Sequence, residues 1–134
     1  MGCVFCMIRD GIIPSAKIYE DDDVLAILDI SQATKGHTLV LPKIHSSNLL
    51  EISEYQFNKV MSKVHMLAGK IVEAMGAEGC NILNNCNEVA GQSVMHFHVH
   101  IIPRYKDDDL KIEFVSHQNQ HNLEEIAKKI TTKL

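Results

Sequence analysis

Three histidines alternate with apolar residues between His96 and His100, and this alternation is the strongest constraint that the chain places on its fold. Side chains of a β-strand point alternately to opposite faces, so the pattern predicts a strand over residues 94–103. The three histidines then share one face. The other face is apolar and should pack on the core through Met95, Phe97, Val99 and Ile101. We therefore expect a sheet with one buried face here, while the histidine face points at a site or at solvent.

The remaining patterns predict an α+β fold. Apolar residues recur at helical spacing over residues 53–75, where Ser53 can cap the helix and Gly76 can end it. Asn122 can cap a C-terminal helix that reaches residue 134. A helical turn is expected at residues 3–9, and strands at residues 16–20, 24–29, 37–42 and 80–84, with a weaker one at 111–115. Because the connections are too short for repeated βαβ units, we expect an antiparallel five-stranded sheet with one long helix and a C-terminal helix.

The length and charge of the chain limit its class. A chain of 134 residues predicts one domain over residues 1–134. The net charge is −4 and no basic stripe is present, which argues against a nucleic-acid binder. Because no apolar run reaches the length of a membrane span and no signal-peptide core is visible, we expect a cytoplasmic protein that is not bound to membranes, with reduced cysteines.

The histidine pattern alone leaves several kinds of site open. Unused surface histidines are disfavoured, because the neighbours form a core strand. A three-histidine metal site and a histidine nucleophile with flanking phosphate ligands both fit the spacing. The preceding loop, residues 84–93, brings amides, a hydroxyl and a glycine that suit phosphate oxygens, although an ordinary turn would use the same residue types. Cys3 and Cys6 form a CxxC pair, which is typical of metal binding or redox chemistry.

Taken together, these residues resemble the histidine-triad (HIT) family. Its signature of three alternating histidines is present as His96-Phe97-His98-Val99-His100-Ile101-Ile102. The resemblance continues through residues 28–31, 35–43 and 90–93 and covers about residues 3–105, so that the C-terminal segment 106–134 is variable. The chain is most similar to the Hint-like branch, in its bacterial CxxC-containing form.

The resemblance implies a nucleotide hydrolase. The middle histidine, His98, would attack the α-phosphorus of a purine nucleotide conjugate, and water would then release a nucleoside monophosphate from the histidine. Ser93 would pass a proton to the leaving group, and His100 would contact the phosphate. The implied catalytic residues are His98, Ser93 and His100, and the implied nucleotide-binding residues are Asp29, Ile30, Asn85, Gln92, Ser93, His98 and His100. Asp29 would accept from the ribose hydroxyls, whereas His37 matches a family position without an assigned task.

CxxC-containing members of this family bind a structural zinc ion, and the resemblance carries its ligands to Cys3, Cys6, His45 and His96. Two thiolates and two imidazoles form a sensible tetrahedral set. In members without the CxxC pair, the first histidine of the triad serves the leaving group instead. Because Cys3 and Cys6 are present, we expect His96 to bind zinc. A redox CxxC is the alternative, but no thioredoxin-like βαβ pattern surrounds it.

The resemblance favours a nucleoside phosphoramidase, with a dinucleoside polyphosphate hydrolase as the alternative. It also implies a homodimer whose sheets join. A zinc-stabilised nucleotide-binding or scaffold protein with little turnover is a hypothesis of a different class. The residues do not separate the two hydrolases, because the site of the leaving group depends on the C-terminal segment and on the dimer.

Overall fold

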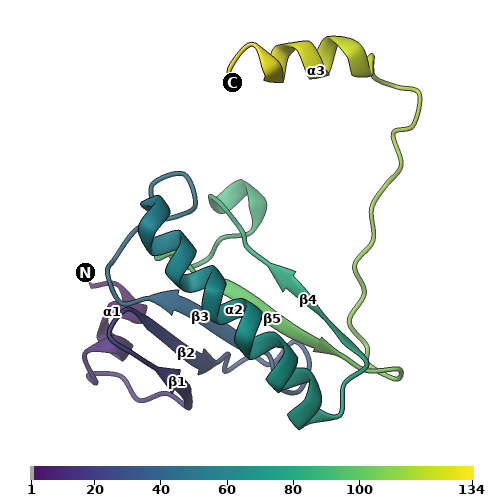
Figure 1. Cartoon of the computed structure of the whole chain (residues 1–134). Coiled ribbons are helices and arrows are strands. Elements are labelled where there is room, and N and C mark those ends of the chain that lie inside the picture. The colour runs from purple at the N-terminus through teal and green to yellow at the C-terminus, as the bar shows by residue number, and fades with distance from the viewer. Residues whose placement is uncertain (1) are drawn as a thin grey trace.

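The computed structural model describes residues 2–134 and shows one antiparallel sheet with the strand order β1-β2-β3-β5-β4 (Figure 1). Its strands are β1 (Lys17–Glu20), β2 (Val24–Leu28), β3 (Thr38–Pro42), β4 (Gly79–Leu83) and β5 (Val99–Arg104). The helices are α1 (Val4–Arg9), α2 (Glu54–Met75) and α3 (Leu123–Thr131), with a 3-10 turn, η1 (Glu88–Ala90). The predicted α+β fold with five antiparallel strands, a long helix and a C-terminal helix is confirmed.

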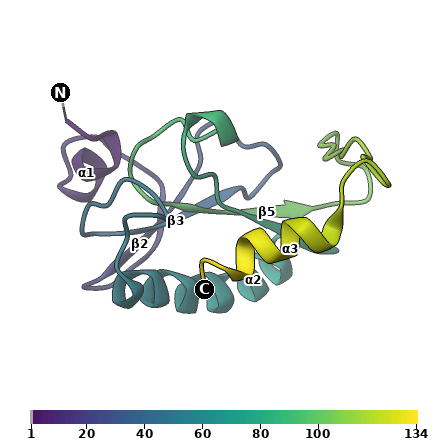
Figure 2. The ribbon, with the colours of Figure 1, turned by 90° about the horizontal axis from the view of Figure 1, so that it is seen from above.

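Helices cover both faces of the sheet. Figure 2 shows α2 along one face and α1 at the opposite face. The apolar stripe of α2 packs on alternate residues of the sheet, through Val60, Val64, Leu67 and Ile71 against Val24, Ala26, Val40, Val99 and Ile101. The intervening sheet residues face α1, where Phe5 and Ile8 meet Leu25, Ile27, Leu39 and Leu41. Burial on both faces explains why β2 and β3 are continuous apolar runs rather than alternating ones.

The predicted helix boundaries are confirmed at their caps. The Ser53 hydroxyl accepts from the Gln56 amide at 3.2 Å, and Gly76 ends α2 with a φ of 64°. Asn122 caps α3 by accepting from the Glu125 amide at 3.2 Å. Among residues 2–134, none of the helices combines the length and apolar character needed to cross a bilayer.

The histidine strand is shorter than predicted. β5 begins at Val99, so His96 and His98 precede it and Met95 is 43% exposed rather than part of the core. The cause is a hydrogen bond to a distant loop, because the Phe97 amide donates to the Ser46 carbonyl at 2.7 Å rather than to a neighbouring strand. The alternation itself persists, since Phe97 is buried beside α2 while His98 contacts Phe5 on the α1 side.

The chain after β5 also differs from the prediction. Residues 111–115 form no strand within the described part of the chain, because no neighbouring strand pairs with them. They belong to an extended segment that leads to α3, and Figure 1 shows α3 standing apart from the sheet and α2.

Candidate active site and metal centre

A cavity of about 470 Å³ opens on the α1 face of the sheet. Its walls combine residues of α1, β2, β3 and β5 with residues of the adjoining loops, and they include both polar groups and apolar side chains. The cavity is lined by five of the predicted site residues, Asp29, Ile30, Ser93, His98 and His100, together with apolar side chains that include Phe5, Ile8, Ile27 and Leu39. Such a mixture suits a ligand that has an apolar ring and an anionic group.

The imidazole of His98 is held in one orientation. It is 6% exposed, and its Nδ1–H donates to the His96 carbonyl at 2.7 Å, which leaves the Nε2 lone pair free. The side-chain amide of Asn84 donates to the His98 carbonyl at 2.8 Å and fixes the backbone there. The Phe5 ring lies edge-on to the imidazole of His98, with the ring centroids 5.0 Å apart. Burial lowers the pKa of His98, so the ring is kept neutral. A neutral, oriented imidazole with one free lone pair is a competent nucleophile.

The second cavity histidine, His100, is oriented by His37. The Ala33 amide donates to His37 Nδ1 at 3.1 Å, so His37 carries its proton on Nε2. That proton is donated to His100 Nδ1 at 2.8 Å, which leaves His100 with an Nε2–H donor. The unassigned His37 is therefore a positioning residue for His100. An N–H donor on the cavity wall suits a phosphate oxygen.

The Asp29 carboxylate lies beside this histidine pair. Its Oδ1 accepts from the Ser31 amide at 2.8 Å and from the Ser31 hydroxyl at 2.6 Å, and its Oδ2 lies 3.7 Å from His37 Nε2. Burial raises the pKa of Asp29, but the bonds from Ser31 outweigh it, and the pKa falls below its usual value. The site thus holds an ionised acceptor with a largely uncommitted Oδ2.

We expect His100 to make stability depend on pH. Burial, then His98 and His37, lower the pKa of His100 from 6.5 to about 4. Between these two values the unfolded chain binds the proton more readily, so the free energy of unfolding decreases as the pH falls through this range. The full shift corresponds to about 3 kcal/mol. Denaturant unfolding at pH 7 and at pH 4 measures the difference.

The matched test replaces one histidine at a time. His100→Gln should show a shallower loss of stability between pH 7 and pH 4 than the wild type. The same change at His65, an exposed residue of α2, should leave the pH dependence unaltered. Identical pH dependence in His100→Gln and the wild type would contradict a depressed pKa.

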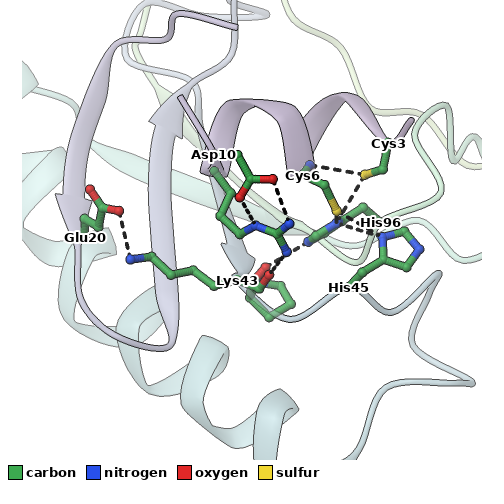
Figure 3. Close-up of polar contacts among 9 residues, drawn as sticks. Cys3, Cys6, Asp10, Glu20, Lys43, His45 and His96 are labelled. Atoms are coloured by element: carbon green, nitrogen blue, oxygen red, sulfur yellow. Dashed lines mark hydrogen bonds and ion pairs between the residues drawn. The ribbon is translucent and has the colours of Figure 1, made fainter. Parts of the chain in front are cut away.

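A cluster of two thiols and two imidazoles joins three segments of the chain. Figure 3 shows Cys3 and Cys6 at the start of α1 meeting His45, from the loop after β3, and His96. His96 Nδ1 lies 3.3 Å from Cys3 Sγ, 3.5 Å from Cys6 Sγ and 3.1 Å from His45 Nδ1. A tetrahedral zinc ion requires ligand–ligand distances of about 3.3–3.8 Å, given its usual bond lengths. The two sulfur–nitrogen distances fall in this range and the distance between the imidazole nitrogens is slightly shorter, so the donor set suits zinc and needs only a small adjustment at His45.

The orientation of His96 fits metal binding as well. Its Nε2–H donates to the Pro42 carbonyl at 2.8 Å, which presents the Nδ1 lone pair to the cluster. A backbone acceptor for the second ring nitrogen is the usual support of a metal-binding histidine. His96 is fully buried, burial lowers its pKa to about 4, and it does not line the cavity. Both ring nitrogens are thus committed away from the position of a leaving group.

Two predicted nucleotide ligands lie outside the cavity. Gln92 is 3% exposed. Its side-chain Nε2 donates to the Ser47 carbonyl at 2.6 Å, and its side-chain oxygen accepts from the backbone amide of Asn87 at 2.8 Å. Asn85 Nδ2 makes a long bond of 3.4 Å to the Gly91 carbonyl. In this structure Gln92 joins two loops, and Asn85 bridges one of them, rather than contacting the space beside His98.

Sequence reasoning missed two supporting residues, Phe5 and Asn84, and left the task of a third, His37, open. Phe5 lies between the two cysteines and packs on His98, Asn84 holds the His98 carbonyl, and His37 orients His100. The position of Phe5 inside the CxxC pair could have revealed its role, because metal ligands on either side fix the residue between them. The tasks of Asn84 and His37 depend on contacts between distant segments and leave no local signal.

Comparison with known proteins identifies relatives over most of the chain. The HIT domain profile matches residues 10–107. The protein named hit from Bacillus subtilis is 47% identical over 125 residues, which cover 92% of this chain and 86% of the relative. An adenosine 5′-monophosphoramidase from Schizosaccharomyces pombe is 39% identical over 81% of this chain and 78% of its own length. An adenylylsulfatase from Arabidopsis thaliana is 43% identical over 81% of this chain and 55% of its own length.

Solved structures share the fold. A crystal structure of a HIT family member from Bacillus subtilis has a TM-score of 0.94 at 44% identity, covering 100% of this chain and 98% of the other. A zinc-bound histidine triad protein from Mycobacterium smegmatis has a TM-score of 0.79 at 33% identity, covering 100% of this chain and 99% of the other.

Proposed function

Since the chain belongs to the HIT family, we propose that it is a nucleoside phosphoramidase, a hydrolase acting at the α-phosphorus of purine nucleotide conjugates. The observation that carries the proposal is the fixed tautomer of His98, whose Nδ1–H is bound to the His96 carbonyl while Nε2 stays free. This nucleophile shares one cavity with an ionised Asp29 and an N–H donor on His100. The relatives named as a phosphoramidase and an adenylylsulfatase support the same reaction class.

In the proposed first step, His98 Nε2 attacks the α-phosphorus and the bond from phosphorus to the leaving nitrogen breaks. The electron pair departs with the amine, which takes a proton from the Ser93 hydroxyl. The Nε2–H of His100 donates to a phosphate oxygen and stabilises the charge that develops there. In the second step, water attacks the phosphorus and gives a proton to the Ser93 oxygen, which restores the hydroxyl, while the bond to His98 breaks, its electron pair returns to Nε2 and a nucleoside monophosphate leaves. Two displacements replace one difficult direct hydrolysis.

We assign the apolar and the polar lining residues of the cavity to two parts of the substrate. The apolar wall of Phe5, Ile8 and Ile27 would receive the purine base, with Ile30 at the fully exposed rim. Asp29 would accept from the ribose hydroxyls. We also propose Asn85 and Gln92 as phosphate ligands, which requires that they exchange their present hydrogen bonds for bonds to the phosphate.

We expect Asp29→Asn to raise KM about 10–100-fold, because a hydrogen bond to a charged acceptor is lost. The same change at Asp22, an exposed turn residue, is the matched control and should leave KM unaltered. Removing both ribose hydroxyls from the substrate should weaken binding to the wild type but have little further effect on Asp29→Asn. An equal penalty in both proteins would contradict the ribose assignment.

The remaining parts of the proposal concern zinc and assembly. Cys3, Cys6, His45 and His96 would hold one structural zinc ion, which would supply a fixed link between the N-terminus and the segment before β5. We further propose a cytoplasmic homodimer that does not bind nucleic acid. Reduced thiols persist in the cytoplasm, and all four cysteines are free.

Incubation with a small panel of substrates tests the activity. Adenosine phosphoramidate should release AMP at a higher kcat/KM than a diadenosine polyphosphate does. The opposite order would favour the dinucleoside polyphosphate hydrolase. If the protein binds AMP but converts neither substrate, the binding or scaffold hypothesis replaces the enzyme.

A further inference from the structure

A second cavity, of about 520 Å³, adjoins the cavity that contains His98. It lies between the start of α1, the loop after β3 and the segment before β5, and Cys3 and His45 of the metal cluster take part in its lining. The linings of the two cavities have three residues in common, namely Val4, Ser93 and Val94. The nucleotide of the proposed function occupies the first cavity, so the second is available to another part of the substrate.

The position of Ser93 decides which part of the substrate reaches the second cavity. In the proposed function its hydroxyl gives a proton to the leaving amine, so the amine nitrogen must lie within hydrogen-bond reach of Ser93. His98 lines the first cavity but not the second. Because a leaving group departs from the side of phosphorus opposite to the nucleophile, the amine points away from His98. The groups carried by the leaving nitrogen therefore extend past Ser93 into the second cavity.

The lining of the second cavity offers no charged side chain to a negatively charged leaving group. Among the described residues that line it, none is a lysine, an arginine, an aspartate or a glutamate. Apolar contacts come from Val4, Val94 and Met95, while Ser47 adds a polar group. A nucleoside polyphosphate carries several negative charges, and such a group binds where cationic side chains neutralise it. The lining therefore suits an uncharged amine with an apolar substituent and not a polyphosphate.

Met95 is the large exposed apolar residue of this lining. Its place in the alternating pattern predicts a core residue, but it is 43% exposed and lines the second cavity instead. A methionine side chain is flexible and polarisable, and its sulfur makes favourable contacts with aromatic rings. An apolar substituent that covers Met95 and Val94 removes their surface from water, which favours binding. Met95 is thus placed to recognise a ring or an aliphatic group on the leaving amine.

We propose that the second cavity is the subsite for the leaving group and that it selects uncharged amines with an apolar substituent. Met95 is the residue of the lining that sets this preference. The inference deepens the proposed hydrolase and rests on it. It separates the phosphoramidase from the dinucleoside polyphosphate hydrolase by the charge of the group that leaves, because only the uncharged amine matches the lining.

Three substrates whose amines have similar basicity test the subsite in the full-length protein. Adenosine phosphoramidate has no substituent on its nitrogen, the phenethylamine derivative carries an apolar ring, and the glutamate derivative carries two carboxylates. The wild type should cleave the phenethylamine derivative with a kcat/KM at least about tenfold higher than that for the glutamate derivative, because burial of a phenyl ring favours binding by about this factor. Release of AMP measures both rates. An equal or opposite preference in the wild type would overturn the proposal.

Met95→Arg tests the residue that sets the preference. The new guanidinium pairs with the carboxylates, so the ratio of kcat/KM for the phenethylamine derivative to that for the glutamate derivative should fall at least about tenfold. A ratio within one protein is insensitive to a general loss of activity, so poor folding does not imitate the effect. Tyr55→Arg adds the same charge on α2, where Tyr55 is 61% exposed, and should leave both the ratio and the activity unchanged. The wild-type ratio in Met95→Arg would contradict the role of Met95.

The proposed hydrolase and the subsite fail separately. A wild type that releases AMP from adenosine phosphoramidate but does not distinguish the two derivatives contradicts the subsite and leaves the hydrolase intact. If the wild type cleaves no substrate, calorimetric binding decides. Tighter binding of the phenethylamine derivative than of the glutamate derivative, reversed in Met95→Arg, then supports the subsite and contradicts the hydrolase. Equal binding of the two derivatives without cleavage contradicts both.

Discussion

Replacing His98 with alanine should lower kcat/KM for adenosine phosphoramidate by at least about 10⁴-fold, because the covalent step loses its nucleophile. The geometry makes the effect specific. His98 Nδ1 is tied to the His96 carbonyl and Nε2 is the free nitrogen, whereas His100 presents a proton rather than a lone pair. Among the described residues, no other imidazole that lines the cavity can therefore take over the attack. Steady-state release of AMP measures the loss.

His65→Ala is the matched control, because it makes the same change on the exposed side of α2. It should retain wild-type kcat and KM. AMP binding to His98→Ala should stay within about threefold of the wild type, since Asp29 and the apolar wall are untouched. After rapid acid quenching, the wild type should carry one nucleotidyl group on histidine and His98→Ala none. Turnover by His98→Ala at more than a tenth of the wild-type rate would exclude His98 as the nucleophile.

The fold was predictable where one local rule decided it. Ser53 and Gly76 mark the ends of α2 through capping and left-handed geometry, and both act over a few residues. The prediction that a strand begins at Val94 was wrong because contacts with a distant segment, rather than a local rule, decide the structure there. Alternation continues through this segment, but the Phe97 amide donates to the Ser46 carbonyl, which is not close to it in sequence.

The site divides in the same way. His98 and His100 reach one cavity because the alternation at the start of β5 places them on the same side, and Asp29 joins them from the end of β2. Gln92 illustrates what a pattern cannot show. A glutamine near a phosphate site suggests a ligand, yet its amide is used by Ser47 and Asn87, which come from two different loops. The choice between binding a ligand and holding a loop depends on tertiary contacts that periodicity does not encode.

The candidate metal cluster of Cys3, Cys6, His45 and His96 is linked to the cavity through α1, which contributes residues to both. Cys3 and Cys6 flank Phe5, and Phe5 packs on His98 at 5.0 Å while lining the cavity. A bound ion would therefore hold both the Phe5 wall of the cavity and the segment that carries His98. Only one other polar contact in the described chain ties the α1 side chains to the loop after β3, namely the bond from Arg9 to the Lys43 carbonyl at 2.6 Å. Without metal, the α1 wall should become mobile.

Removing the metal should accordingly have the largest effect on stability. Purified protein should contain about one zinc ion per chain, as a four-ligand site implies. With free zinc at about 1,000 times its dissociation constant, the ion stabilises the fold by about 4 kcal/mol. Strong chelation, or Cys6→Ser, should therefore lower the melting temperature by about 10 °C or more. Differential scanning calorimetry measures the melting temperature, and metal analysis measures the zinc content.

Cys86→Ser provides the control, since Cys86 lies outside the cluster and its replacement should leave zinc content and melting temperature unchanged. A structural ion and a catalytic ion differ in whether loss of the ion affects the melting temperature or the transfer of the nucleotidyl group to His98. In Cys6→Ser at low temperature, KM should rise because Phe5 and the α1 wall move, while the nucleotidyl group should still form on His98. If chelation abolished transfer to His98 without altering the melting temperature, the ion would act in the chemistry. A purified wild type without zinc, and with a melting temperature insensitive to added zinc, would rule out the site.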